Sequence, residues 1–158
     1  MVFIILGTQD KAFPRLLAEI EKQIKIGNIK GKVIVQAGYT KYKSDKTEIH
    51  DILSMDEFNN YIKKSDYIIT HAGVGSILDS IRASKKIIAV PRLSKYKEHV
   101  NDHQIQIATE FEKLGYIIKS DVSDLGSNIK KLNTFHPQKF KSNNNNFIKT
   151  ISDYIDNL

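Results

Sequence analysis

Residues 71–76, His-Ala-Gly-Val-Gly-Ser, combine two glycines with a hydroxyl between an apolar run and a helical repeat. Gly73 and Gly75 would let a ligand approach the backbone without Cβ atoms in the way. A helix that begins near Ser76 would direct free N–H groups and its positive dipole end toward a phosphate. Asp79, one turn further on, is suited to the diol of a ribose. The spacing is equally compatible with a tight strand-to-helix turn and a capped helix.

A second polar cluster lies at residues 98–104, Glu-His-Val-Asn-Asp-His-Gln. Asp102, His103 and Gln104 offer both donors and acceptors, as binding to a polyhydroxylated ligand requires. His99 and His103 are four residues apart, a spacing that also suits two metal ligands on one helix. However, Asp102 is expected at the helix N-cap, so His99 would lie outside the helix. We therefore favour a sugar-like ligand and predict no metal, with a structural cap as the other alternative.

The third polar segment directly follows the first apolar run. Gly7 and Thr8 can present backbone N–H groups to a phosphate or to a bound acceptor, and Gln9 and Asp10 would lie at the mouth of a cleft. A plain strand-to-helix turn is the alternative. Neither a Walker A pattern nor a Gly-x-Ser-x-Gly pattern is present, and Leu78 stands where a dinucleotide fingerprint would have its third glycine. The segments predict binding of a phosphorylated molecule rather than attack by a protein nucleophile.

The elements that must position these segments alternate along the chain. Continuous apolar runs, typical of strands buried on both faces, occupy residues 2–6, 32–38, 66–70, 86–92 and 116–120, and residues 48–53 fit a short strand. Helical spacing is found at residues 13–24, 55–65, 75–84, 102–115 and 121–132, with a capping box predicted at Ser54 and Glu57. This alternation predicts an α/β fold, a Rossmann-like parallel sheet with helices on both faces. Ligands bind such sheets at the carboxyl ends of the strands, where all three polar segments are expected.

The composition is that of a globular domain, with 158 residues of which 41% are hydrophobic and 27% charged. No apolar run reaches the roughly 18 residues that span a bilayer, and the start does not resemble a signal peptide, so we expect a cytoplasmic location. The net charge of +6 comes from scattered lysines, which favours a solvated surface over an anionic partner or membrane. No nucleic-acid motif is present. The absence of cysteine excludes disulfides.

Towards the end of the chain the alternation stops. Residues 133–146 include four consecutive asparagines and are typical of a polar linker. Residues 147–158 place apolar side chains on one helical stripe, which predicts a C-terminal helix that packs on its own domain or on a partner. The folded domain is therefore expected to span residues 1–132.

Four motifs together resemble the C-terminal domain of glycosyltransferase family 28. They are ILGTQDKAFPRLL, VIVQAGYTKY, YIITHAGVGSILDSI and KKIIAVPRLSKYKEHVNDHQIQIA, in this order. The similarity is greatest to small stand-alone members, the bacterial polysaccharide-synthesis subunits of the PssE or EpsF type and the eukaryotic Alg13 subunit. The resemblance implies the C-terminal half of a GT-B glycosyltransferase.

For function, the resemblance implies the donor-binding and catalytic subunit of a two-component inverting glycosyltransferase. It would move a sugar from a UDP-sugar, its substrate, to a lipid-linked glycan in exopolysaccharide, capsule or related glycan synthesis, without a cofactor. A membrane-associated subunit of the Alg14 or PssD type would supply the acceptor half, so that this chain would be peripheral to the membrane. No nucleic acid is expected. A non-catalytic, UDP-sugar-binding regulatory subunit is the alternative.

The resemblance also implies roles for single residues. Gly73, Val74, Gly75 and Ser76 would hold the diphosphate, and Asp79 stands where relatives usually have a glutamate that binds the ribose. His103 and Gln104 match the pair that faces the donor sugar and are the candidate catalytic residues, with a general base in the partner as the alternative. The complete set of candidate donor-binding residues is Gly7, Thr8, Gly38, Leu53, His71, Gly73, Val74, Gly75, Ser76, Asp79, His99, Asp102, His103 and Gln104.

Overall fold

The computed structural model describes residues 1–140 of the chain. The strands are β1 (Val2–Ile5), β2 (Val33–Gln36), β3 (Glu48–His50), β4 (Tyr67–Thr70), β5 (Lys86–Ala89) and β6 (Ile118–Lys119). The helices are α1 (Pro14–Lys25), α2 (Met55–Lys64), α3 (Val74–Arg82), α4 (His103–Lys113) and α5 (Leu125–Lys131), with a short 3₁₀ helix, η1 (Ser94–Tyr96). The predicted helix over residues 147–158 lies outside the described residues.

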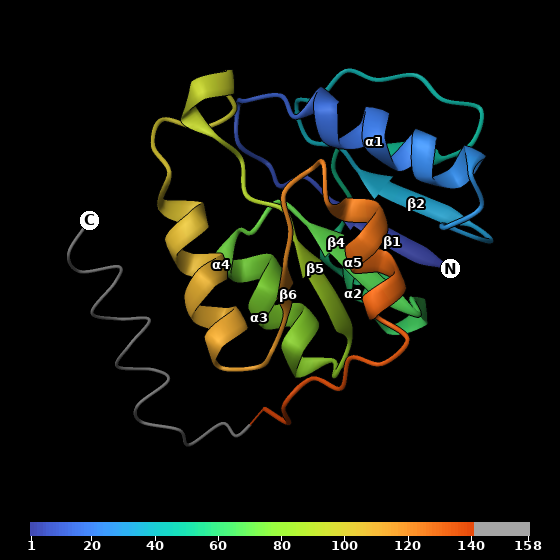
Figure 1. Cartoon of the computed structure of the whole chain (residues 1–158). Coiled ribbons are helices and arrows are strands. Elements are labelled where there is room, and N and C mark those ends of the chain that lie inside the picture. The colour runs from blue at the N-terminus through green and yellow to red at the C-terminus, as the bar shows by residue number, and fades with distance from the viewer. Residues whose placement is uncertain (141–158) are drawn as a thin grey trace.

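The strands form one six-stranded parallel sheet in the order β3-β2-β1-β4-β5-β6 (Figure 1). The chain moves outward from β1 to β3 and then crosses back to place β4 on the other side of β1. The order therefore reverses between β1 and β4, and this is the position where open sheets of this kind bind ligands. The sheet confirms the predicted α/β class.

Helices cover both faces of the sheet, which explains the continuous apolar runs of its strands. Val2 and Ile4 of β1 contribute to a core with α1 and α5, whereas Phe3 and Ile5 contribute to a core with α2. A third cluster joins β5 to α3 and α4. Every residue of β1 is buried, whichever face it points to, as expected for a central strand covered on both faces.

Several local predictions hold and a few elements are shorter than expected. Ser54 and Glu57 form the predicted capping box at the start of α2, and Pro14 occupies the first turn of α1. The strand expected over residues 48–53 is only three residues long, and β3 lies at the edge of the sheet with one neighbour. The 3₁₀ helix η1 was not predicted; it ends at Lys97, which adopts a left-handed conformation with φ of 59°.

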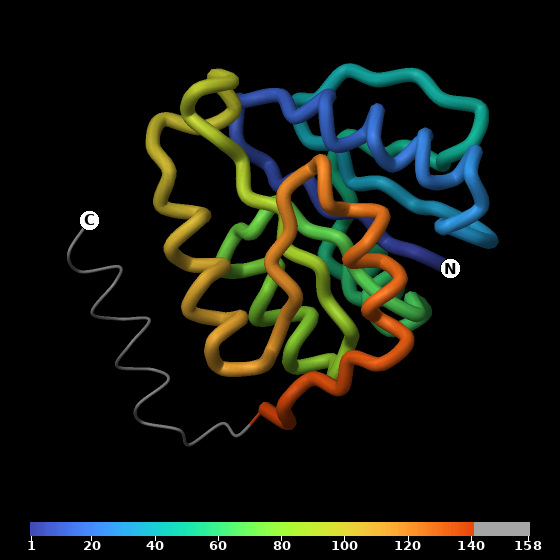
Figure 2. Tube along the Cα trace, viewed as in Figure 1, coloured from blue at the N-terminus to red at the C-terminus, as the bar shows by residue number. Residues whose placement is uncertain are grey.

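After α5 the chain continues across the surface without helix or strand up to residue 140, at the bottom of the view in Figure 2. Phe135 packs against the core beneath α1 and α5, and Phe140 packs against Tyr116. The N–H of Gln138 donates to the carbonyl of Gly115 at 3.0 Å. Within residues 1–140, no helix has the length and apolar character needed to cross a membrane.

Candidate donor-binding site

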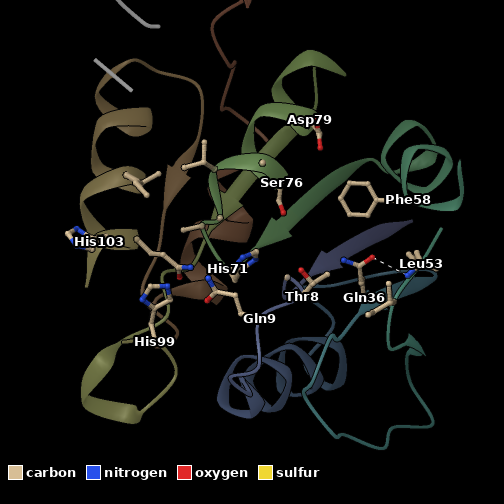
Figure 3. Close-up of a pocket in the computed structure, with 18 of the residues that line it drawn as sticks. Thr8, Gln9, Gln36, Leu53, Phe58, His71, Ser76, Asp79, His99 and His103 are labelled. Atoms are coloured by element: carbon tan, nitrogen blue, oxygen red, sulfur yellow. Dashed lines mark hydrogen bonds between the residues drawn. The ribbon is translucent and has the colours of Figure 1, made fainter. Parts of the chain in front are cut away.

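A cavity of about 640 Å³ lies at the carboxyl ends of β1 and β4, where the strand order reverses (Figure 3). The loops after β1, β4 and β5 all contribute to its walls, so the three polar segments of the sequence meet in one place. The starts of α2 and α3 and the first turn of α4 complete it. The lining residues are Gly7, Thr8, Gln9, Gln36, Ile52, Leu53, Met55, Phe58, His71, Ala72, Gly73, Val74, Gly75, Ser76, Asp79, His99, Asn101, His103, Gln104 and Ile107.

Two of the candidate residues, Gly38 and Asp102, do not line the cavity. Gly38 has a φ of +57°, and a Cβ there would collide with the carbonyl oxygen of Gly7. This position therefore requires glycine because its backbone packs against the β1–α1 turn, outside the cavity. Asp102 occupies the N-cap position of α4, but its side chain does not cap the helix. Its carboxylate instead accepts from the N–H of Ser94 at 2.8 Å, and the Oδ1 of Asn101 accepts from the N–H of His103.

The N-terminus of α3 forms one wall of the cavity. Its N-cap residue is Gly73, so no side chain accepts a hydrogen bond from the first N–H groups of the helix. An added Cβ at Gly75 would meet no atom within 4 Å, because this residue faces open space. An N-terminus without a capping side chain, beside an open cavity and the Ser76 hydroxyl, is suited to an anion. Ala72, just before it, has a left-handed φ of 67°, a strained conformation for a residue with a Cβ.

His71 forms the floor of the cavity between two glycines. Its Nδ1 lies 3.2 Å from the carbonyl oxygen of Ile5, which can only accept, so Nδ1 carries the proton of the neutral ring. A Cβ at Gly7 would lie 2.6 Å from Nε2 of the ring, and one at Gly73 would also overlap it. Burial first, and then the charge of Arg92, lower the pKa of His71 to about 4. Gly73 is therefore needed to accommodate His71, a different reason from the approach of a ligand.

Gln104 and His103, on α4, also line the cavity, but in different ways. Gln104 is buried, and its Oε1 accepts from the N–H of Arg92 at 3.0 Å, so its amide N–H groups remain as donors. The His103 ring points outward, away from His71, and its Nδ1 lies 3.3 Å from Oε1 of Gln106 (Figure 3). The His99 ring contacts the backbone of Asn101 instead. Among residues 1–140, no three His, Asp or Glu side chains gather as a metal site would require.

Apart from Leu53, the sequence did not single out the residues of the wall formed by β2 and α2. Gln36 is buried at the end of β2, and its Oε1 accepts from the N–H of Leu53 at 3.3 Å (Figure 3). A glutamine inside an otherwise apolar run was the available signal. Phe58 and Met55 had none, because apolar residues on an amphipathic helix are expected in the core. Together Phe58 and Met55 provide apolar side chains in the same cavity as the Gln36 amide.

The whole sequence, residues 1–158, matches the model of the glycosyltransferase family 28 C-terminal domain. The chain belongs to this family. Among curated family relatives, the UDP-N-acetylglucosamine transferase subunit ALG13 of Candida albicans is 33% identical over 88 residues, which are 56% of this chain and 29% of that protein. The subunit of the same name from Kluyveromyces lactis is 29% identical over 155 residues, covering 72% of this chain and 77% of that protein. Several other relatives of this name are longer, and the match covers about a third or less of their length.

Solved structures show the same fold as this family 28 domain. An NMR structure of ALG13 superimposes with a TM-score of 0.62 and 22% identity, covering 95% of this chain and 93% of that one. MurG of Acinetobacter baumannii has a TM-score of 0.55 and 17% identity, covering 83% of this chain but 40% of the longer one. The predicted fold, the C-terminal half of a GT-B glycosyltransferase, is confirmed.

Proposed function

We propose that this chain binds a UDP-sugar and forms the donor half of a two-component inverting glycosyltransferase, with UDP-N-acetylglucosamine as the first donor to test. The observation that carries the proposal is the N-terminus of α3, which has no capping side chain and lines the same cavity at the switch point as the buried Gln104 amide. A helix N-terminus that can bind an anion, together with amide donors in the same cavity, fits a diphosphate joined to a sugar. The names of the ALG13 relatives agree with this donor.

Each part of the donor would have its own wall. The diphosphate would lie on the N–H groups of Val74, Gly75 and Ser76, and the ribose diol near the partly exposed Asp79. The uracil would lie beside Phe58 and the backbone of Leu53. As the sugar leaves, negative charge develops on the diphosphate, and the positive end of α3 would stabilise that charge without a metal.

The acceptor and its base would belong to another chain. His71 is buried with Nδ1 directed at a backbone carbonyl, and the His103 ring points outward, so neither is well placed as a general base from this side alone. The word subunit in the relatives' names supports a partner. We propose a membrane-associated partner of the Alg14 or PssD type that binds a lipid-linked acceptor and holds this chain at the cytoplasmic membrane surface, in exopolysaccharide, capsule or related glycan synthesis.

The outward His103 ring also supports the second candidate, a regulatory subunit that binds the UDP-sugar without taking part in transfer. Substitution of Gln104 by Ala in the reconstituted pair separates the two. A regulator would keep the transfer rate at saturating donor, whereas a catalytic donor half would lose it.

Calorimetric titration with UDP and UDP-N-acetylglucosamine, on the chain alone and with its partner, tests donor binding. We expect Asp79→Asn to weaken UDP about tenfold, since a hydrogen bond to a charged group is worth at least about 1.5 kcal/mol. Asp45→Asn, in an exposed loop away from the cavity, is the matched control and should bind as the wild type does. If neither ligand binds under either condition, the proposed function is wrong.

A further inference from the structure

Arg92 lies two residues after Val90, whose N–H donates to the carbonyl of Thr70 and continues the pairing of β5 with β4. It is one of the most deeply buried side chains in the described part of the protein, with 1% of its surface exposed. Burial lowers its pKa, and its Nε has no hydrogen-bond partner in the described part of the chain. Burying a guanidinium is costly, and an apolar residue of similar volume would often be as stable. The position therefore calls for an explanation other than core packing.

The side-chain hydrogen bonds of Arg92 all go to backbone carbonyls close to the cavity. Its Nη2 donates to the carbonyl of Leu6 at 2.5 Å, at the end of β1. Its Nη1 donates to the carbonyl of Lys11, in the β1–α1 loop, and to that of Glu98, in the β5–α4 loop, at 3.1 Å. One planar group thus joins two loops that both line the donor cavity.

An ion pair also connects the β5–α4 loop to the start of α1. Glu98 is 3% exposed, and Arg15 of α1 donates to both of its carboxylate oxygens, at 2.5 and 2.8 Å. The Oε2 of Glu98 also accepts from the N–H of Leu93 at 3.0 Å. The Arg15 guanidinium lies 4.5 Å from the centre of the Tyr96 ring, which adds contact with η1. The β5–α4 loop is therefore fixed at both its start and its middle.

We propose that Arg92, supported by the Glu98–Arg15 pair, is a positioning residue that sets the distance between Gly7–Gln9 and His99–Gln104, the two loop segments that line the donor cavity. The proposal rests on the proposed function for its catalytic consequence. Arg92 does not line the cavity and would not touch the donor. It acts through the two loops whose carbonyls it holds, and one of these loops leads to His103 and Gln104, the residues expected at the sugar, whereas the diphosphate is expected on α3.

Hydrogen exchange of the ligand-free chain tests the clamp without reference to activity. In Arg92→Lys and Glu98→Gln, amides of residues 7–11 and 93–104 should exchange at least about tenfold faster, whereas those of α2 and α5 should not change. Lysine keeps the charge but loses the planar fork, so a geometric role predicts that it fails to substitute. Lys86→Met, which removes a cation bonded to the Leu132 carbonyl elsewhere on the domain, and Glu110→Gln, in an exposed ion pair of α4, are the matched controls. Exchange at the wild-type rate in both loops of both clamp variants would overturn the proposal.

Binding and transfer test the consequence for the donor. Arg92→Lys should bind UDP nearly as the wild type does, since the seat on α3 is intact, but lose the additional affinity for the UDP-sugar. In the reconstituted pair its kcat should fall about 100-fold at saturating donor, as a displacement of about 1 Å predicts. Equal weakening of UDP and UDP-sugar, with kcat retained, would contradict positioning. If the wild-type pair transfers no sugar, the proposed function fails, while hydrogen exchange still decides whether the clamp exists.

Discussion

At the scale of single residues, burial strongly changes the protonation of His71. It is buried at the cavity floor, its Nδ1 bonds to the Ile5 carbonyl, and burial together with the charge of Arg92 lowers its pKa to about 4. The unfolded chain has the ordinary pKa of about 6.5. Below pH 6.5 the unfolded state therefore binds a proton that the folded state does not, and stability falls until the pH reaches about 4.

The difference between the folded and unfolded pKa of His71 predicts that the protein loses stability between pH 7 and pH 5, a range in which carboxylates contribute little to the change. Between pH 7 and pH 5 the free energy of unfolding should decrease by about 2 kcal/mol because of His71 alone. Glu48, whose pKa is lowered to about 2, chiefly by Lys32, would weaken the fold only at lower pH. Urea denaturation at the two pH values measures the decrease.

The control for this prediction is a second histidine variant. His71→Gln should abolish most of the decrease, whatever its effect on stability at pH 7. His136→Gln, at an exposed position, should leave the decrease unchanged. A His71→Gln protein with the wild-type pH dependence would show that His71 is not the group responsible.

Residue types predicted the composition of the site better than the role of each residue. Gly73, Gly75 and Ser76 were found from their spacing, and all three line the cavity. That Gly73 makes room for a histidine ring could not be read from sequence, because the ring comes from the same short loop and its direction depends on Ile5. The burial of Arg92, which brings its charge close to His71, likewise had no signal in the sequence, since arginine is usually exposed.

At the scale of elements, the start of α3 allows a test that separates folding from binding. Gly75→Ala adds a Cβ that meets no atom, in a helix, so the free energy of unfolding should rise by roughly 0.5–1 kcal/mol. The same Cβ would point into the space proposed for the diphosphate, so UDP affinity should fall about tenfold. Urea denaturation and calorimetric titration measure the two effects.

Gly73→Ala is the matched variant at the other glycine. Its Cβ would overlap the His71 ring, so it should lower the free energy of unfolding by about 1–3 kcal/mol, the usual cost of overpacking. Only at Gly75 should stability and UDP affinity change in opposite directions. Wild-type UDP binding by Gly75→Ala would place the phosphate elsewhere.

Most elements could be predicted because burial left a clear pattern. Strands covered on both faces are continuously apolar, and Ser54 with Glu57 marked the start of α2. The edge strand β3 and the short helix η1 were less clear, because neither has enough buried positions to show a period. The order of the strands, and so the meeting of the three loops, follows from long-range pairing of β1 with both β2 and β4.

At the scale of the whole molecule, the extent of the domain is open to test. The alternation of strands and helices ends near residue 132, and residues beyond it read as a polar linker. In the structure, Phe135 contributes to the core beneath α1 and α5, and Phe140 packs against Tyr116 in the cluster of α3 and α4. Two isolated aromatic residues in a polar segment carry no periodicity, so the sequence offered no reason to include them.

These contacts predict that the folded unit extends to residue 140. Phe135→Ala and Phe140→Ala should each lower the free energy of unfolding by about 2 kcal/mol, roughly half the cost of deleting a fully buried phenylalanine. Because the two rings belong to separate clusters, the double variant should lose close to the sum. Tyr39→Ala, which removes a ring that is 58% exposed, is the control and should change stability by about 0.5 kcal/mol or less. Urea midpoints equal to the wild type in both phenylalanine variants would end the domain near residue 132 and make residues 133–140 part of the linker.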